Sequence, residues 1–373
     1  MADFIQMDSA ADIPGNEPAV TWLLPSRRHP YYIVAPRYIG TSAGIKSLHL
    51  FCHSLNRAGE RAYLITQPYY LPVYAVNPAL QTPLVTTTIL RHDFERGLAP
   101  IVVYPETIKG NPFRAPFVTR YIMNIPGLLG GDSIYDDDEY LLTYSKALAE
   151  ELPRKSLTVF VPASDPTVFY PDETQQRMGT CFYAGKYKYF HQGELLPVTQ
   201  DSLEITREQP NSQTPQQLAD LFRRSELFYC YENSALAIEA VLCGCPVVFI
   251  PNRFFTKVIG QYEHGWDGMA WGTDADEIAR AKRTVGHARM TYLSLYTKFR
   301  EQLSRFVTET QQIASEVTYE RPMEITYLAR PNIFLLLAAN LEIIRSIMSE
   351  KGWVNGMKIM VNRVRRKSVR ILP

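Results

Sequence analysis

The sequence predicts an α/β protein with two domains of similar size, each built around a parallel sheet. Its 373 residues exceed one ordinary domain and suit two domains of about 150 residues each. A unit of strand, glycine-containing loop, helix and strand occurs twice, once near the N-terminus and once in the second half. Between these units, residues 163–177 are rich in Pro and Asp and show no periodicity, which indicates an interdomain linker.

The first unit begins with a short apolar run at residues 31–35, which is typical of a buried strand. A loop with Gly40 and Gly44 follows, and apolar residues then recur at helical spacing until Gly59, a candidate C-cap. Residues 62–65 are the next expected strand. In the rest of this half we expect strands at residues 85–90, 101–104, 141–144 and 157–161, and a helix at residues 118–124.

The second unit begins with a strand at residues 180–184, which ends at Gly185. Thr214 is expected to cap a helix at residues 216–225, with Pro215 in its first turn. The unit is completed by strands at residues 204–205, 227–231 and 246–250 and by a helix at residues 235–242 that Gly244 stops.

We therefore expect residues 1–165 to form an N-terminal Rossmann-like domain and residues 166–330 a C-terminal Rossmann-like domain. Residues 331–373 are expected to supply a helix that packs back on the N-terminal domain, followed by a basic tail. Apolar spacing near 3.6 predicts C-terminal helices at residues 275–288, 292–307 and 332–349.

Composition excludes several classes of protein. The formal net charge of +1 argues against nucleic acid as a partner. The acidic, polar N-terminal segment does not resemble a signal peptide, and the longest apolar run near the C-terminus, residues 333–339, is too short to span a bilayer. An odd number of cysteines, three of them in apolar segments, indicates reduced and buried thiols in a cytoplasmic protein. These are Cys52, Cys181, Cys230, Cys243 and Cys245.

The most informative segment is residues 229–250, where a strand, a polar loop, a helix, a glycine and a strand follow in 22 residues. Asn233 or Ser234 can cap the helix, whose N–H groups and macrodipole favour an anion such as a diphosphate. Glu232 lies at the helix start, and Glu239 lies further in, where a carboxylate can accept two hydroxyl hydrogen bonds from a ribose. The alternative is a buried helix with a solvated Glu232 and a Glu239 satisfied within the core.

This segment resembles the C-terminal-domain signature of GT-B fold glycosyltransferases, in the retaining family that includes bacterial lipopolysaccharide and phosphoinositol mannosyltransferases. That family carries Glu-x7-Glu, then a small residue and Gly-x-Pro-Val. The chain has Glu232, then Glu239-Ala240 and Gly244-Cys245-Pro246-Val247, with six residues rather than seven between the two glutamates. The resemblance implies that Glu239 holds the nucleotide ribose and that Glu232, the candidate catalytic residue, contacts the donor sugar.

Two further segments are similar to the same family. Lys186 and Lys188 follow Gly185 at the place of the family's Gly-Arg-like turn, whose basic side chains hold the donor diphosphate. The alternative is two solvated lysines. Residues 40–44 resemble the family's glycine-rich first loop. The donor-binding candidates are Gly44, Lys186, Lys188, Asn233, Ser234, Ala235 and Glu239.

Candidates for the acceptor or the cleft lie mainly in the first half. Glu106 and Asn111 follow the expected strand at residues 101–104, and ligands of α/β sheets lie at the carboxyl ends of strands. Ser42 belongs to the glycine-rich loop, and His264 lies in a polar aromatic loop of the second half.

Two features suggest a metal site and are interpreted otherwise. Residues 136–139 contain Asp-x-Asp, the pattern of metal-dependent transferases with the single-domain GT-A fold, but they occupy a glycine-containing loop and fit a solvated turn. His49 and His53 are spaced like two metal ligands on a helix, without an evident third ligand. We therefore expect no metal.

The resemblance implies a GT-B fold, in which two Rossmann-like domains face each other across a cleft and C-terminal helices follow. It implies a metal-independent glycosyltransferase of the hexosyltransferase type that retains anomeric configuration. The sugar would move from a nucleotide-sugar donor on the C-terminal domain to a glycan or lipid-linked acceptor on the N-terminal domain, in bacterial surface polysaccharide synthesis. The nucleotide sugar is a substrate, so no cofactor is expected.

Three alternatives stay open. The basic residues of 357–373 either lie on the anionic inner face of the cell membrane, where each adds about 1 kcal/mol, or form a solvated end. The same architecture also suits a sugar-nucleotide epimerase. The shortened spacing between Glu232 and Glu239 is compatible with a non-catalytic, glycosyltransferase-like subunit.

Overall fold

The computed structural model describes residues 28–207, 212–329 and 341. The basic tail at residues 357–373 and, apart from Leu341, the expected helix at residues 332–349 lie outside the described residues.

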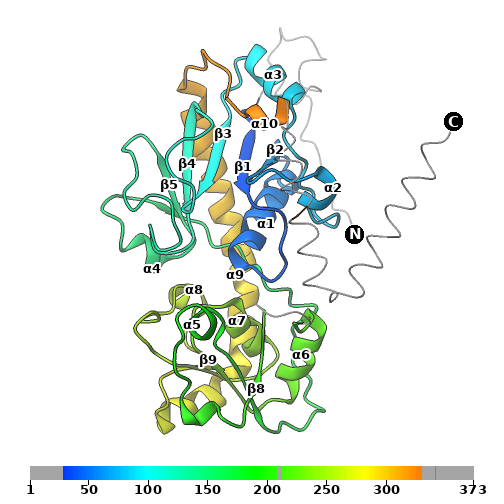
Figure 1. Ribbon diagram of the computed structural model, residues 1–373, viewed down its shortest axis with the longest axis vertical. Coiled ribbons are helices and arrows are strands. Elements are labelled where there is room, and N and C mark those ends of the chain that lie inside the picture. The colour runs from blue at the N-terminus through cyan, green and yellow to red at the C-terminus, as the bar shows by residue number, and fades with distance from the viewer. Residues whose placement is uncertain (1–27, 208–211, 330–340, 342–373) are drawn as a thin grey trace, which may run out of the picture.

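The first domain is built on a parallel sheet that, within the described residues, has six strands in the order β2-β1-β3-β4-β5-β6 (Figure 1). These are β1 (Tyr31–Ala35), β2 (Ala62–Thr66), β3 (Ile101–Pro105), β4 (Phe117–Ile122), β5 (Tyr140–Thr143) and β6 (Leu157–Thr158). Its helices are α1 (Ala43–Arg57), α2 (Pro72–Ala75), α3 (Thr87–Glu95) and α4 (Lys146–Ala149). Every residue of β1 is buried, as expected for a central strand of a parallel sheet. Helix α1 buries Leu48, Phe51 and Leu55 on one face, so its apolar periodicity holds it against the sheet.

The second domain is built on another parallel sheet, with five strands among the described residues in the order β11-β10-β9-β7-β8. They are β7 (Thr180–Tyr183), β8 (Leu203–Glu204), β9 (Leu227–Cys230), β10 (Val247–Phe249) and β11 (Met269–Trp271). Its helices are α5 (Gly185–Tyr189), α6 (Pro215–Arg224), α7 (Ala235–Leu242) and α8 (Gln261–His264), with a 3₁₀ turn at Pro197–Thr199. The predicted start of α6 is confirmed: Thr214 accepts a hydrogen bond from the backbone N–H of Gln217 in a capping box.

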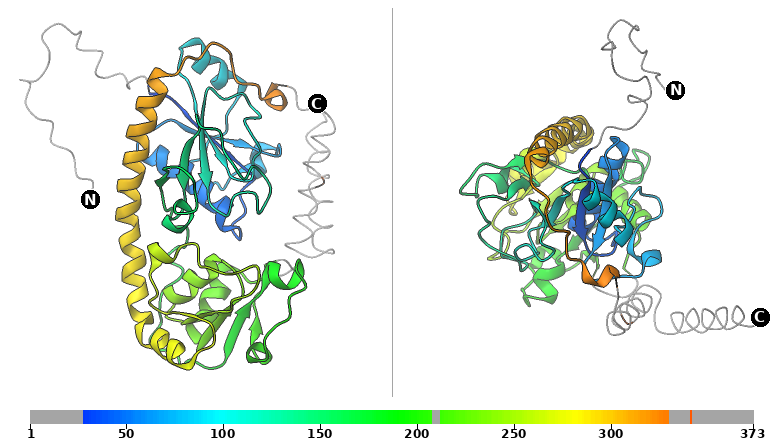
Figure 2. Two further views of the ribbon diagram at one scale, coloured as in Figure 1. Left: turned by 90° about the vertical axis from the view of Figure 1, so that its left-hand side faces the viewer. Right: turned by 90° about the horizontal axis from the view of Figure 1, so that it is seen from above.

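A single long helix, α9 (Ala275–Glu316), runs along both domains (Figure 2). Its first half packs into the core of the second domain through Tyr292 and Leu295, and its second half packs into the core of the first domain through Phe299 and Phe306. The two helices expected at residues 275–288 and 292–307 are therefore one. Neither Gly nor Pro interrupts the chain between them, so the helix continues. The chain returns to the first domain near Phe299, earlier than the expected residue 331. Helix α10 (Thr326–Ala329) follows there.

Two further secondary-structure predictions are wrong. The strand expected at residues 85–90 does not form. Residues 87–90 lie in α3, because Thr86 caps that helix and accepts a hydrogen bond from the N–H of Ile89 at 3.2 Å. The helix expected at residues 118–124 is instead strand β4, which pairs with β3 and β5. A short apolar run fits either type of element, and pairing within the sheet decides between them.

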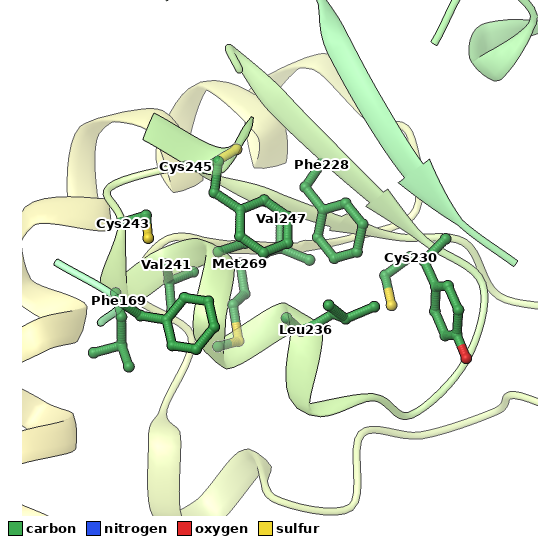
Figure 3. Close-up of a cluster of buried hydrophobic side chains, with 14 of the residues drawn as sticks. Phe169, Phe228, Cys230, Leu236, Val241, Cys243, Cys245, Val247 and Met269 are labelled. Atoms are coloured by element: carbon green, nitrogen blue, oxygen red, sulfur yellow. The ribbon is translucent and has the colours of Figure 1, made fainter. Parts of the chain in front are cut away.

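One hydrophobic cluster of the second domain packs the sheet against α6, α7 and α9 (Figure 3). Cys230, Cys243 and Cys245 contribute to it beside Phe228 and Leu236. The prediction of buried, unpaired thiols is confirmed for all five cysteines of the sequence, each of which the structure describes. Burial raises the pKa of the Cys243 thiol to about 12, so this side chain behaves as an apolar group at neutral pH.

The architecture is thus α/β, with two facing Rossmann-like domains and a long helix after the second sheet. Among the helices of the described residues, none is both long enough and apolar enough to cross a bilayer.

Candidate functional site

A cavity of about 590 Å³ lies between the two domains and is lined by residues of both. The first domain contributes the loop before α1 and the carboxyl end of β3, and the second domain contributes the start of α7 and the segment after β7. Helices α1 and α7 lie where the two domains face each other (Figure 1). The carboxyl ends of parallel strands and the loops after them are where α/β sheets bind ligands, and the volume suits a small organic molecule.

Two helix starts, one from each domain, open on this cavity. Ser42 and Gly44 line it at the start of α1, and Ser234 and Ala235 line it at the start of α7. In the described part of the chain, the Ser42 hydroxyl makes no capping hydrogen bond, whereas the Ser234 hydroxyl accepts one from the N–H of Leu236 at 3.3 Å. Backbone N–H groups at a helix start carry partial positive charge, so the cavity is suited to an anion.

Glu232 lies at the wall of the cavity beside α5. Its Oε2 accepts a hydrogen bond from the N–H of Tyr187 at 3.3 Å. Gly185 makes this approach possible: a Cβ there would lie 2.4 Å from the Tyr183 hydroxyl and 3.0 Å from Glu232 Oε1. An added Cβ at residue 185 would therefore force the Tyr183 side chain to move.

We expect Gly185→Ala to lower the free energy of unfolding by about 1 to 2 kcal/mol, because the added methyl group overpacks the Tyr183 and Glu232 side chains. Denaturant titration measures the change. Gly286→Ala is the matched control: this exposed glycine of α9 has no atom within 4 Å of an added Cβ, so alanine there is expected to stabilise the helix by about 0.5 to 1 kcal/mol. Equal effects of the two substitutions would show that space at Gly185 is not limiting.

The two lysines after β7 have different surroundings. Lys186 lines the cavity, whereas Lys188 lies outside its lining and pairs with Glu204 at 2.6 Å. The reason is local: residues 185–189 form the helical turn α5, in which side chains two residues apart do not face the same way. The expected joint role of the two lysines at one diphosphate is therefore not supported for Lys188.

Glu239 is 2% exposed and both of its oxygens are paired with cations. Lys46 Nζ from α1 lies 3.7 Å from Oε1, and Arg207 Nη2 lies 3.1 Å from Oε2. Arg207 also lines the cavity and donates to the backbone oxygen of Thr41 in the first domain at 2.6 Å. The carboxylate expected to hold a ribose is thus the centre of an ion cluster between the domains, and it lies behind the cavity lining.

Sequence reasoning missed Lys46 and Arg207. Burial lowers the pKa of Lys46, and the nearby Glu239 carboxylate opposes that effect. The one signal in the sequence was Glu239 itself, because a carboxylate inside an apolar helix requires a buried partner.

Asn233 lines the cavity, and its side chain makes hydrogen bonds that hold a neighbouring segment of the cavity wall in place. Its side-chain amide donates to the backbone oxygen of Lys257 at 3.0 Å, and its Oδ1 accepts from the N–H of Ile259 at 2.9 Å. Val258 and Ile259, which these bonds hold, also line the cavity.

Glu106 follows β3 and is a buried carboxyl on the side of the cavity that the first domain forms. It is 4% exposed, and its Oε2 accepts a hydrogen bond from the N–H of Met123 at 3.2 Å. Burial raises the pKa of this carboxyl above its ordinary value, and the hydrogen bond from Met123 opposes the shift. A carboxyl with a raised pKa in a cavity is suited to exchange a proton with a bound ligand.

Asn111, the other candidate after β3, lies outside the cavity lining. Its Oδ1 accepts from the Tyr104 hydroxyl at 3.1 Å, and its amide donates to the backbone oxygen of Ala115 at 2.9 Å. The side chain therefore closes a turn, which corrects its expected place in the cleft.

His264 lines the cavity, as expected, with its ring against the aromatic rings of Tyr292 and Phe160. Burial lowers its pKa to about 3, so the ring is neutral at physiological pH. It can supply a hydrogen bond there but no charge.

The acidic run at residues 136–139 is a turn, as interpreted from the sequence. Asp136, Asp137 and Asp138 are exposed, and Glu139 is buried in an ion pair with Arg120 at 2.6 Å. Within residues 28–207 and 212–329, no group of three or more acidic, His or Cys side chains is placed to hold a metal ion.

No protein-family model matches the chain, and no curated protein matches its sequence. Among solved structures, the chain is similar to the glycosyltransferase SnogD from Streptomyces nogalater, with a TM-score of 0.42 and 13% identity over 77% of this chain and 99% of that chain. It is similar to a glycosyltransferase from Rickettsia africae ESF-5, with a TM-score of 0.42 and 9% identity over 78% and 99% of the two chains. It is also similar to WaaG, a glycosyltransferase involved in lipopolysaccharide biosynthesis, with a TM-score of 0.39 and 9% identity over 76% and 99%. At these identities and TM-scores the likeness carries no argument about the reaction, and the architecture rests on the two sheets of the chain itself.

Proposed function

We propose that the protein is a glycosyltransferase that moves a sugar from a nucleotide-sugar donor to an acceptor hydroxyl in the cavity between its domains. One observation carries this proposal: two helix starts and Lys186 meet at one interdomain cavity that also holds Glu232 and Glu106. The helix starts and Lys186 can stabilise an anionic leaving group, and the two carboxylates can accept hydrogen bonds from sugar hydroxyls. The resemblance of residues 229–250 to the GT-B signature supports the same function.

The donor is proposed to bind the second domain. The N–H groups of Ser234 and Ala235 and the ammonium of Lys186 would stabilise the diphosphate, while Gly44 lets the start of α1 approach it. Glu232 would accept hydrogen bonds from the donor sugar. Glu239 is proposed to hold the ribose hydroxyls, which requires them to replace Arg207 at its Oε2.

The acceptor is proposed to bind the first domain, with its reacting hydroxyl at Glu106 and with Ser42 and the neutral His264 as further hydrogen-bonding groups. The acceptor oxygen would attack the anomeric carbon from the face of the departing diphosphate, as retention requires. Its proton would pass to the Glu106 carboxylate as the bond between the anomeric carbon and the diphosphate breaks. Lys186 and the helix starts would offset the charge that develops on the leaving group, so the proposal includes no metal. Enclosure between the domains would limit hydrolysis of the donor by water.

Resemblance alone supports two finer parts of the proposal, a retaining hexosyl transfer and a role in bacterial surface polysaccharide synthesis. The odd number of cysteines supports a cytoplasmic location. The composition of residues 357–373 supports a peripheral position on the anionic inner face of the membrane.

Binding of nucleoside diphosphates tests the donor site. UDP, GDP and ADP are titrated into the full chain by calorimetry, and the one that binds is titrated into Lys186→Ala and Lys188→Ala. Losing a charge-assisted phosphate contact at Lys186 is expected to weaken binding about tenfold. Lys188→Ala, the matched control outside the cavity lining, is expected to change the affinity less than about twofold. Equal effects of the two substitutions would contradict the proposed donor site.

Product analysis tests the reaction. The sugar nucleotide that binds is incubated first alone and then with candidate acceptors. A changed sugar nucleotide from the donor alone would identify an epimerase. Tight donor binding without turnover on any acceptor would identify a non-catalytic subunit.

A further inference from the structure

Arg120 of β4 is a charged side chain that is fully buried, with an exposed fraction of 0%. Glu139 accepts two hydrogen bonds from it, from Nε at 2.8 Å and from Nη2 at 2.6 Å. The guanidinium also lies over the rings of Tyr104 and Tyr135, 5.3 Å from each centroid. Taking an ion pair out of water is costly, and apolar side chains would fill the same space more favourably. The remaining contacts of Arg120 indicate what the buried charge does.

The other hydrogen bonds of Arg120 hold the backbone that carries Glu106. Its Nη1 donates to the backbone oxygen of Ile108 at 2.6 Å, and its Nη2 donates to that of Gly110 at 3.0 Å. Both oxygens belong to residues 106–111, directly after β3, which we call the Glu106 turn. The donors of a guanidinium form a rigid planar fork, so the carbonyl groups that bind it are fixed relative to one another.

Further contacts join the Glu106 turn to the segment after β4. Gly131 has a φ of +76°, and a Cβ there would lie 1.9 Å from the backbone oxygen of Glu106, so only glycine permits this approach. Asp132 Oδ2 accepts a hydrogen bond from the N–H of Gly110 at 2.5 Å. The Glu106 carboxyl itself accepts a hydrogen bond from the N–H of Met123. The carboxyl therefore reaches the cavity from a turn whose backbone is held at several points.

We propose that Arg120 is a positioning residue for the reaction, which fixes the Glu106 turn so that the Glu106 carboxylate meets the acceptor hydroxyl. This inference rests on the proposed function. Arg120 lies outside the cavity lining, and Glu139 compensates its charge, so it acts through the place of Glu106 and not by contact with a substrate. A displacement of about 1 Å can cost a reaction as much as 100-fold in rate, so a loosened turn lowers turnover. Donor binding to the second domain is unaffected.

Amide hydrogen exchange tests the positioning without any substrate. Exchange of the Met123 N–H, which donates to the Glu106 carboxyl, is measured on the full chain by NMR. Arg120→Lys is expected to speed this exchange at least about tenfold, because an ammonium is a point charge that cannot hold two carbonyls and a carboxylate in one plane.

Arg154→Lys is the matched control for the exchange measurement. Arg154 donates to the backbone oxygens of Asp137 at 3.0 Å and of Glu139 at 2.9 Å, and in the described part of the chain its hydrogen bonds go to residues 136–139. It therefore holds the same segment after β4 without holding the Glu106 turn. Exchange of the Met123 N–H and turnover are both expected to stay within about twofold in this variant.

A double-mutant cycle with Glu106→Gln separates positioning from a general loss of structure. Turnover is expressed per nucleoside diphosphate binding site, which calorimetry counts on each sample. Arg120→Lys is expected to lower kcat at least about tenfold in the unaltered chain and less than about twofold in the Glu106→Gln variant, because no base is left to position. A merely structural role would lower kcat by the same factor in both backgrounds.

If Arg120→Lys does not fold, Asp132→Ala gives the same test, since it releases Gly110 of the Glu106 turn without leaving a buried charge unpaired. Unchanged Met123 exchange, or equal factors in the two backgrounds of the cycle, would overturn the positioning role and leave the proposed function standing. An unaltered chain that binds no nucleoside diphosphate and transfers no sugar would instead overturn the proposed function, and the positioning role with it.

Discussion

Replacing Glu239 by Gln is expected to raise the dissociation constant of the nucleoside diphosphate that the protein recognises by about 100-fold. The carboxylate is proposed to accept two ribose hydroxyl hydrogen bonds, and bonds to a charged group are worth about 1.5 to 3 kcal/mol each. Glutamine keeps the size of the side chain but loses the charge that Lys46 and Arg207 require. Calorimetric titration of the variant measures the change in affinity.

The control for this prediction is Glu204→Gln, which removes another carboxylate of the second domain that is paired with a lysine, here Lys188. Glu204 lies outside the cavity lining, so its substitution is expected to leave the affinity within about twofold. A Glu239→Gln variant that binds as tightly as the unaltered chain would leave Glu239 as a purely structural partner of Lys46 and Arg207.

The ion cluster of Glu239, Lys46 and Arg207 links the two domains. Lys46 comes from α1 and Arg207 contacts Thr41, so the first domain meets Glu239 directly and through Arg207. A buried carboxylate that loses its charge leaves two cations facing each other with little water between them. A ribose that replaces Arg207 at Glu239 would in turn release Arg207, and with it the contact to Thr41.

The part of the site formed by one continuous segment, the start of α7, was predictable from the sequence. Helix α7 has the predicted bounds because Ser234 caps it, apolar helix formers fill it, and Gly244 stops it with a φ of +74°. The two parallel sheets were predictable for the same reason, since each strand, loop and helix unit carries its own pattern. The resemblance to a known signature added roles to these residues but no geometry.

Contacts between distant segments were not predictable. No local pattern links Lys46 to Glu239. The different surroundings of Lys186 and Lys188 depend on the helical turn α5, where a Gly-Arg-like turn with both lysines at one diphosphate was expected. Such features arise from packing between elements, which one sequence without its structure does not specify.

Replacing Glu106 by Gln is expected to lower kcat by at least about 100-fold while making the protein more stable at neutral pH. The loss of turnover follows if Glu106 takes the proton of the acceptor hydroxyl, since general base catalysis contributes about 100-fold or more. The gain in stability follows from burial, which raises the pKa of the Glu106 carboxyl from its ordinary value of 4.5. Between that value and the raised one, the folded state binds more protons than the unfolded state, so stability falls as pH rises through this window. Glutamine carries no such penalty, and it can still accept the hydrogen bond from the Met123 N–H.

The matched control is Glu263→Gln, because burial also raises the pKa of Glu263, which accepts a hydrogen bond from the N–H of Lys146 and lies outside the cavity lining. Thermal unfolding between pH 4 and pH 8 is expected to show a flatter pH dependence for both variants than for the unaltered chain. Only Glu106→Gln is expected to lose turnover, measured with a sugar nucleotide and an acceptor that the unaltered protein uses. If both variants keep full turnover, Glu106 forms part of the cavity wall and takes no proton. The reacting hydroxyl must then lose its proton to another base, and Glu232 and the departing diphosphate are the candidates beside the proposed donor.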